Sequence, residues 1–186
     1  MRENWNRLAQ RVLAMARDEA SRSQRPQVGT EHILLALCRL EEGAAPKVLA
    51  RHCATLDRVR KEVDRIRHAV KGRAAAADLT FSPHAQAVMH QAEVEAERIS
   101  FGEVGPVHLL LGIAQHEECA AARILTGLDV VLTDLWVEVV SQIAESETRK
   151  RSNPTPPPLP GIREKDGKLA QAIVRRATDM ARSMRA

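Results

Sequence analysis

A ten-residue stretch that occurs twice constrains the fold of this chain more than any other feature. Residues 28–37 read VGTEHILLAL, and residues 104–113 read VGPVHLLLGI, 76 positions later. The segments around them keep the same offset without an insertion, since LAQRVLAMARDEA at 8–20 aligns with HAQAVMHQAEVEA at 84–96. Self-similarity held in register over this length indicates two copies of one structural unit.

Apolar residues recur in the first copy at the three- and four-residue spacing of a helical face. The spacing predicts helices over about 7–23, 30–40, 44–52 and 56–70. Only 2% of the residues are aromatic, so Leu, Val, Ile and Ala must fill the core, and this composition favours helices over sheets. The second copy should repeat the same four helices.

Several residues have the chemistry of helix starts. Asn6 or Asn4 can cap the first helix, and Thr30 can cap the second, because their side-chain oxygens can accept a backbone N–H. In the second copy, Ser82 is placed as an N-cap, with Pro83 at the first helical position. These signals fix where the helices of each copy should begin.

One four-helix unit alone is small for a stable core. We therefore expect an all-α domain over residues 1–147, in which two tandem repeats, about 3–70 and 80–146, pack with pseudo-twofold symmetry. After it, consecutive prolines predict a Pro-rich linker over 148–163. Residues 164–186 should form a basic amphipathic helix. Its apolar face would carry Leu169, Ile173, Ala177, Met180 and Met184.

The net charge of +4 is unevenly distributed along the chain. Residues 149–186 hold ten Lys/Arg and three Asp/Glu, whereas residues 1–148 hold eighteen and twenty-one. A basic tail can contact nucleic acid or an anionic membrane. The tail lacks the aromatic residues that stack on bases, so docking on a partner protein, or a linker role, is the favoured interpretation.

The three cysteines, Cys38, Cys53 and Cys119, are an odd number at unrelated spacings, which fits neither a disulfide framework nor a metal-binding pair. Cys38, Cys53 and His52 lack a fourth ligand, so no metal site is expected. There is no run of 18 apolar residues and no apolar stretch of the signal-peptide type at the start. These features predict a soluble cytoplasmic protein with no membrane span.

The repeated pattern resembles the Clp N-terminal domain, the repeat domain at the front of the ClpC, ClpA and ClpB unfoldases, with ClpC the most similar. The resemblance covers about residues 3–146 and is carried by VGTEHILLAL, the EEGAA that follows it, and FSPHAQ at 81–86. It implies a binding module that is no enzyme and needs no cofactor. Its partners would be Clp ATPase or protease components, adaptor proteins or substrates.

In ClpC-type members the domain also resembles a reader of arginine-phosphorylated proteins, with one pocket in each repeat. Such a pocket needs an anion site at a helix start and a carboxylate for the guanidinium. In the first repeat the resemblance assigns these roles to Asn6, which replaces a family Thr, together with Thr30 and Glu31.

The second repeat lacks part of this set, because its corresponding residues are Ser82, Pro106 and Val107. Losing the carboxylate should cost on the order of 1.5–3 kcal/mol, the typical range for a charged hydrogen bond. We therefore expect one competent pocket, in the first repeat, and a degenerate second one.

Other interpretations of these residues stay open. Glu31 can simply be a first-turn acid that the helix dipole favours. His32 and His108, at equivalent positions, are read as packing and hydrogen-bonding residues rather than as catalytic or metal-binding ones. A hydrolase using Glu31 and His32 is disfavoured, since no nucleophile lies in a recognisable elbow.

The sequence GIREKDGKL at 161–169 is not a phosphate loop. It has five residues between the glycines, where four are needed, and Leu169 in place of Ser or Thr. We therefore expect no ATPase here, and interpret the chain as a free-standing Clp N-domain protein or as part of a longer one. The rival function is a nucleic-acid-associated regulator that acts through the basic tail.

Overall fold

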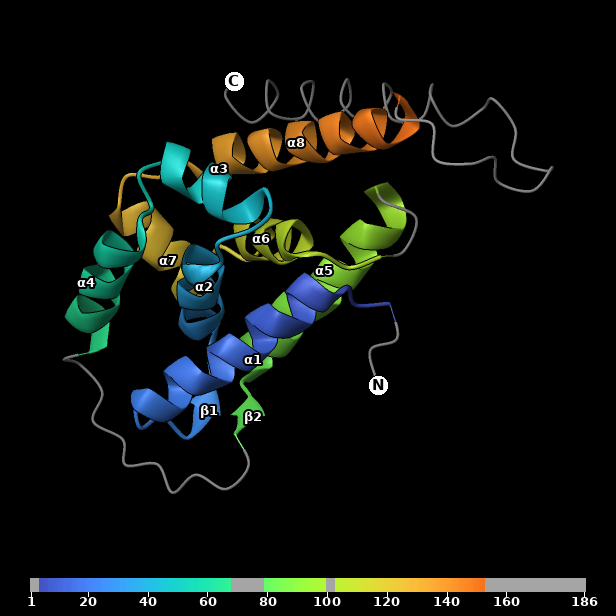
Figure 1. Cartoon of the computed structure of the whole chain (residues 1–186). Coiled ribbons are helices and arrows are strands. Elements are labelled where there is room, and N and C mark those ends of the chain that lie inside the picture. The colour runs from blue at the N-terminus through green and yellow to red at the C-terminus, as the bar shows by residue number, and fades with distance from the viewer. Residues whose placement is uncertain (1–3, 68–78, 100–102, 153–186) are drawn as a thin grey trace.

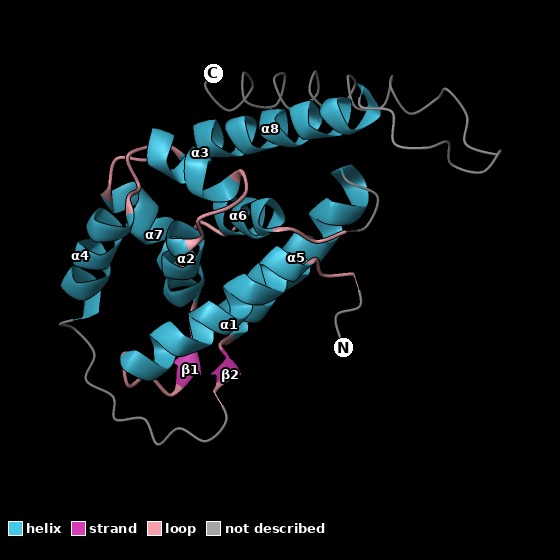
Figure 2. Cartoon of the chain, viewed as in Figure 1, coloured by secondary structure: helices cyan, strands magenta, loops and turns pink. Residues whose placement is uncertain are grey.

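The computed structural model of the protein describes residues 4–67, 79–99 and 103–152. These residues form eight α-helices and two short β-strands (Figures 1 and 2), which confirms the all-α fold. The helices are α1 (Arg7–Arg22), α2 (Thr30–Arg39), α3 (Ala45–Arg51), α4 (Leu56–Arg67), α5 (Pro83–Ile99), α6 (Pro106–Gln115), α7 (Ala120–Gly127) and α8 (Leu132–Ser152). The strands are β1 (Gln27–Val28) and β2 (Thr80–Phe81).

The expected caps of the first helix of each repeat are confirmed. Asn6 Oδ1 accepts the N–H of Ala9 at 2.8 Å at the start of α1. At the equivalent place in α5, Ser82 Oγ accepts the N–H of Ala85 at 3.2 Å, and Pro83 is the first helical residue. Each cap satisfies an N–H group that the helix itself leaves without a partner.

The expected cap of the second helix is wrong by one residue. Gly29, with extended backbone, is the N-cap of α2, and Thr30 is its first helical residue. Gly105 has the same role before α6. Glycine supplies no capping oxygen, and the side-chain hydrogen bond at each of these starts joins the glycine's own N–H to a histidine three residues further on.

The two strands connect the repeats rather than belonging to one of them. β1 pairs with β2 in parallel, with Val28 opposite Phe81, and a single parallel bridge joins Trp5 to Val104. The two pairings are equivalent, because each member of one lies 76 positions from a member of the other. The composition favoured helices alone, and these two-residue strands are the exception (Figure 2).

Backbone hydrogen bonds next to these strand pairs extend the pairing between the two repeats. The N–H of Ser82 donates to the carbonyl of Val28 at 2.9 Å, and the N–H of Asn6 donates to the carbonyl of Val104 at 3.0 Å. The start of the first helix of each repeat therefore lies against the start of the second helix of the other.

The repeated leucine-rich stretches form the centre of the core. The side chains from Ile33 to Leu37 in α2, and from Leu109 to Ala114 in α6, are all buried. Around them, α4 packs on α7 and α3 packs on α8, so the third and fourth helices also pair across the repeats (Figure 1). Burial of each large apolar side chain contributes about 1.5–3 kcal/mol.

Helix α8 is longer than the sequence pattern predicted. It continues to Ser152, five residues into the segment expected to be linker. The first proline after the domain is Pro154, and a proline disfavours helical backbone at the residue before it and removes one hydrogen bond to the residue four positions earlier, so no proline stops the helix at residue 147. The remainder of the expected linker, from residue 153, and the expected helix at 164–186 lie outside the described residues.

Candidate ligand pocket at the start of α2

A pocket of about 290 Å³ opens where the two repeats meet at the start of α2. Residues at the starts of α2, α5 and α7 line it, together with the loop before α2 and one wall from α4. The pocket is therefore shared between the repeats, because α5 and α7 belong to the second one. The crossed pairing of β1 with β2 brings these elements together.

Three helix starts give the pocket a positive electrostatic character. Thr30 and Glu31 of α2, His84 of α5 and Ala120 of α7 all line it. An α-helix leaves its first N–H groups without intrahelical partners and carries a partial positive charge at this end. Three such ends around one cavity make a site suited to an anion. Arg25, which lines the pocket from the loop after α1, adds a full positive charge.

Glu31 provides a carboxylate at the same place. Its side chain folds back over Gly29, and a Cβ atom at residue 29 would overlap the carboxylate. The Glu31 side chain is 22% exposed, so solvent and a ligand can reach it. The absence of a side chain at Gly29 thus allows this position of Glu31.

His32 lies beside Glu31 but does not form an ion pair with it. His32 Nδ1 is 3.6 Å from Glu31 Oε1, yet the same nitrogen accepts the N–H of Gly29 at 2.9 Å. A ring nitrogen that accepts a hydrogen bond carries no proton. The carboxylate of Glu31 is therefore not neutralised by its neighbour.

The two repeated histidines have one structural role. In the second repeat, His108 Nδ1 accepts the N–H of Gly105 at 2.9 Å, as His32 does with Gly29. Both histidines are buried. The interpretation of this pair as packing and hydrogen-bonding residues is confirmed: each ring supplies the reciprocal half of a capping box, in which the side chain at the third helical position accepts the N–H of the N-cap residue.

Thr30 holds one wall of the pocket in place. Its side chain is buried, and its Oγ1 accepts the N–H of Ala121 at 3.1 Å. This bond ties the start of α2 to the start of α7, next to Ala120 in the pocket lining. At the equivalent position of the second repeat, Pro106 has no hydroxyl group and cannot form such a bond.

The structure groups the candidate residues differently from the sequence. Ser82, from the second repeat, lines the pocket with Thr30 and Glu31. Asn6, from the first repeat, lies instead at the start of α6, where a Cβ atom at Gly105 would be 3.1 Å from Asn6 Nδ2. The two capping residues are therefore exchanged between the expected sets: Ser82 lies at the start of α2, and Asn6 lies at the start of α6. The cause is the crossed hydrogen bonding of Ser82 to Val28 and of Asn6 to Val104.

The second position has a different chemistry. Pro106 is buried and Val107 is half-buried at the start of α6, so no carboxylate stands where Glu31 stands in α2. The amide of Asn6 approaches Gly105, on the side where the Glu31 carboxylate covers Gly29. The two positions share their backbone arrangement but not their functional groups.

Several lining residues had no signal in the linear sequence. Arg25, His84 and an apolar wall of Val63, Ile66 and Ile124 were not anticipated. Val63 and Ile124 are buried residues of the core. Only the packing of α4 on α7 brings them to the pocket.

The cysteines do not contribute to the pocket. Cys38 Sγ is 3.5 Å from the carbonyl of Ala54, and burial raises the pKa of the Cys38 thiol to about 12, which suppresses the reactive thiolate. Cys53 is exposed and Cys119 is buried. Among residues 4–67, 79–99 and 103–152, no group of three or more His, Cys, Asp or Glu residues could hold a metal ion.

Residues 4–158 match the family model of the Clp repeat (R) N-terminal domain. ClpC of Staphylococcus epidermidis, an ATP-dependent Clp protease ATP-binding subunit, is 37% identical over 145 residues, or 77% of this chain and 17% of that protein. ClpC of Staphylococcus aureus gives the same identity and coverage. The chain thus spans about a sixth of the length of these relatives.

Solved structures show the same fold at lower identity. The N-terminal domain of the chaperone ClpD from Arabidopsis thaliana superposes with a TM-score of 0.61 at 20% identity, covering 77% of this chain and 99% of that one. The Hsp104 N-terminal domain from Candida albicans gives a TM-score of 0.61 at 16% identity, covering 74% and 90%. In the described part of this chain, no helix combines the length and apolar character needed to cross a membrane.

Proposed function

The chain belongs to the Clp repeat N-terminal domain family, as the resemblance of its repeats predicts, and we propose that it is a protein-binding module of a Clp system. In this role it receives substrates or adaptors for a Clp ATPase or protease, or regulates one. The match of residues 4–158 to the family carries the proposal. The pocket between the repeats offers the place where a segment of the bound protein is recognised.

We further propose that the pocket binds the side chain of a phosphoarginine. This group combines a dianionic phosphoryl group with a guanidinium, so it requires an anion site and a carboxylate side by side. The starts of α2, α5 and α7 and the side chain of Arg25 supply the first. Glu31 supplies the second through charge-assisted hydrogen bonds.

Ser82 completes the anion site. Its Oγ accepts the N–H of Ala85, which leaves the hydroxyl hydrogen to donate to a phosphoryl oxygen. Val107 cannot replace Glu31 at the second position, so one phosphoarginine binds per chain. The first-repeat carboxylate and the second-repeat hydroxyl act together in one site.

Calorimetry of the full chain with free phosphoarginine tests this proposal. We expect one ligand per chain, and a loss of affinity of about 10- to 100-fold in Glu31→Ala, the equivalent of about 1.5–3 kcal/mol for a charged hydrogen bond. Arginine and inorganic phosphate, titrated separately, show which half of the ligand each residue recognises. Absence of binding, or binding that is insensitive to Glu31, contradicts the phosphoarginine proposal and leaves the protein-binding role standing.

Matched variants of the two capping residues test whether the site combines residues from both repeats. Ser82→Ala should weaken binding, whereas Asn6→Ala should leave it unchanged, although each variant removes the cap of a first helix. Val107→Ala serves as the matched control for Glu31→Ala and should also leave affinity unchanged. Weakening by Asn6→Ala and not by Ser82→Ala would place the site within one repeat and contradict the shared pocket.

Nucleic-acid binding through the basic segment 149–186 stays a prediction of the sequence. It requires DNA or RNA affinity that falls steeply with salt, because each phosphate contact releases counterions. A gel shift over a salt series, with the full chain and with a chain ending at Asn153, separates this role from the protein-binding one.

A further inference from the structure

The pocket at the start of α2 has two sides of different chemistry. Its charged and hydroxyl groups lie at the starts of α2 and α5 and in the loop after α1. The apolar wall of Val63, Ile66 and Ile124 comes instead from α4 and α7. In Figure 1, α4 and α7 lie on one side of α2, and α5 lies on the other. A phosphoryl group and a guanidinium are satisfied on the polar side, so they leave the apolar wall without a ligand group.

Ile66 is the member of this wall that a ligand can still cover. Val63 and Ile124 are only 2% and 1% exposed, whereas Ile66 is half-buried. Covering an exposed apolar surface with an apolar group of a ligand is favourable in proportion to the area removed from water. Ile66 therefore favours a ligand that has an aliphatic group beside its charged one.

The second repeat lacks this exposed apolar residue. At the offset of 76 residues, the two buried members of the wall correspond to Val139 and Val48, but Ile66 corresponds to Gln142. The fourth helix of a repeat thus forms with either residue at this place. Ile66 is therefore present, like Glu31, in the first copy only.

We propose that the pocket recognises a phosphoarginine together with an aliphatic side chain next to it in the bound segment. This inference rests on the proposed phosphoarginine site and names the class of segment that the site prefers. The polar side holds the phosphoryl group and the guanidinium, while the aliphatic side chain covers Ile66. A segment with a small polar neighbour leaves Ile66 in contact with water and binds less tightly.

Neighbouring residues of one segment can reach both sides of the pocket. Consecutive Cα atoms are about 3.8 Å apart, and in an extended chain successive side chains point in opposite directions. A phosphoarginine and the residue beside it therefore project away from each other. This geometry matches a pocket whose polar groups and apolar wall come from helices on different sides of α2.

Such a preference selects unfolded segments. Leu, Ile and Val are among the residues most often buried in folded proteins. An aliphatic side chain beside a modified arginine therefore becomes available when its segment leaves the fold. A pocket that binds both groups distinguishes an unfolded substrate from a folded protein with the same modification.

Fluorescence anisotropy of the full chain with labelled five-residue peptides tests the preference. The peptides have phosphoarginine at the centre and differ only in its two neighbours, which are leucine in one peptide and serine in the other. We expect the leucine peptide to bind about tenfold more tightly, because one leucine side chain is largely removed from water. Calorimetry with free phosphoarginine gives the affinity of the polar side alone.

Ile66→Gln introduces the residue of the second repeat. It should reduce the leucine preference from about tenfold to about twofold or less, since the apolar contact is lost, and should leave the affinity for free phosphoarginine unchanged. Leu56→Gln is the matched control, because Leu56 is also half-buried on α4 but does not line the pocket. It should keep the preference. Glu31→Ala should weaken both peptides by the same factor, because it acts on the guanidinium that they share.

The outcomes separate this inference from the phosphoarginine site. Equal affinities of the two peptides, with free phosphoarginine bound, contradict the aliphatic preference alone. A preference that survives Ile66→Gln, or that Leu56→Gln removes equally, contradicts the role of Ile66. If Ile66→Gln weakens free phosphoarginine as much as the leucine peptide, the wall holds the methylene stem of the arginine itself, and the proposal is wrong. Absence of binding by free phosphoarginine refutes both the site and this inference.

Discussion

The starts of α2 and α6 share one backbone arrangement and differ in the chemistry they display. Each begins after a glycine whose N–H is accepted by a buried histidine at 2.9 Å. Over Gly29 lies the carboxylate of Glu31, whereas the amide of Asn6 approaches Gly105. The part that positions the backbone is thus duplicated, while the part that could bind a ligand is present once.

This difference shows which features of a repeat serve the fold and which serve a site. Histidines, glycines and leucines are retained in both copies because each copy needs the same helix start and the same core. Residues 30 and 31 changed to proline and valine in the second copy without loss of the helix. Substitutions at positions where the two repeats differ, and at residues that hold them together, test how far this separation extends.

The packing of the first two helices in each repeat should give the largest effect. In α6, a Cβ atom at Gly112 would lie 2.5 Å from the carbonyl oxygen of Val88 in α5, whereas the equivalent residue of α2 is the buried Ala36. Gly112→Ala should therefore destabilise the protein by about 3 kcal/mol through overpacking. Ala36→Gly should cost only about 1 kcal/mol, the difference in helix propensity.

Urea unfolding followed by circular dichroism measures both variants. A cost of Gly112→Ala below that of Ala36→Gly would mean that α5 and α6 separate easily. In that case the closer packing in the second repeat would not be a structural requirement.

The bond between Thr30 and α7 should give the next effect. Thr30→Val keeps the shape of the side chain but leaves the buried N–H of Ala121 without its acceptor, which should cost about 2 kcal/mol. Thr126→Val is the control, since the Thr126 hydroxyl donates to the carbonyl of Ala122 within its own helix and the residue is exposed. Equal unfolding midpoints for the two variants would show that the start of α2 is not tied to α7 by this bond.

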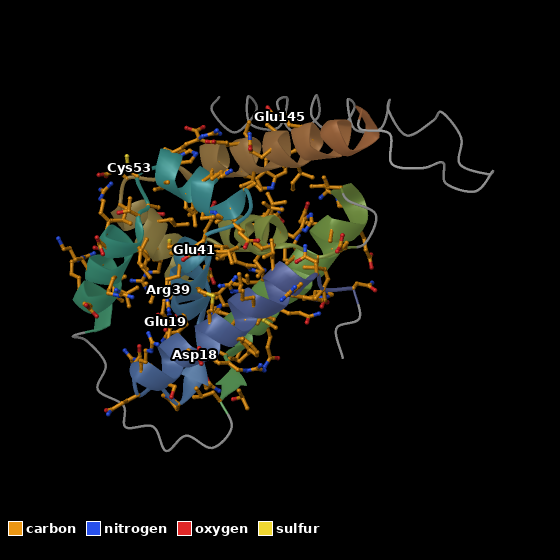
Figure 3. All side chains as sticks on the ribbon, in the orientation of Figure 1. Asp18, Glu19, Arg39, Glu41, Cys53 and Glu145 are labelled. Carbon is orange, nitrogen blue, oxygen red and sulfur yellow. The ribbon has the colours of Figure 1, made fainter. Side chains whose placement is uncertain are left out.

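The two repeats also differ in the residue that contacts an equivalent buried carboxylate. Glu19 of α1 pairs with Arg39 of α2 (Figure 3), whereas Glu95 of α5 accepts a hydrogen bond from Gln115 of α6 at 3.0 Å. Arg39→Gln should destabilise the protein by about 1.5 kcal/mol through loss of a charged hydrogen bond. Gln115→Arg should increase the free energy of unfolding, because it adds a second cation to a fully buried carboxylate that Arg98 already contacts at 3.2 Å. Thermal unfolding of the two variants measures both effects. The two changes in the free energy of unfolding should have opposite signs.

The smallest effect concerns the dependence on pH. Hydrogen bonds from Arg65 lower the pKa of Glu62 below its ordinary value of 4.5. The resulting stability is complete above the pKa of the unfolded state and is lost as pH falls through the lower folded pKa. Glu62→Gln should therefore reduce the loss of stability between about pH 5 and pH 3, whereas Glu117→Gln, at an exposed position, should not. Melting curves over this range measure the difference.

Much of the fold could be predicted from the sequence, because local signals agree with the tertiary structure. The offset of 76 residues and the spacing of Leu8, Val12 and Leu13 identify the repeat and its first helix, and Ser82 with Pro83 marks the start of α5. The roles of His32 and His108 also follow from their position in a helix start. In each case, residues close in sequence determine the structure.

The composition of the pocket could not be predicted in the same way. Glu31 was found from its motif, but its partner there is Ser82 rather than Asn6. A motif within one repeat does not show whether two repeats pair internally or across one another, and the crossed hydrogen bonds to Val28 and Val104 are a property of the tertiary fold. Arg25 and His84 reach the pocket for the same reason.

The crossed pairing of Val28 with Phe81 and of Trp5 with Val104 has a consequence for folding. Each repeat completes the other, so neither half has a closed surface of its own and the two should melt in a single transition. The contacts that hold them together join residues 53 and 99 positions apart, and closing such long loops makes assembly slower than helix formation. A nascent chain can therefore form the helices of its first repeat early, but it can finish the pocket only after the second repeat has been synthesised.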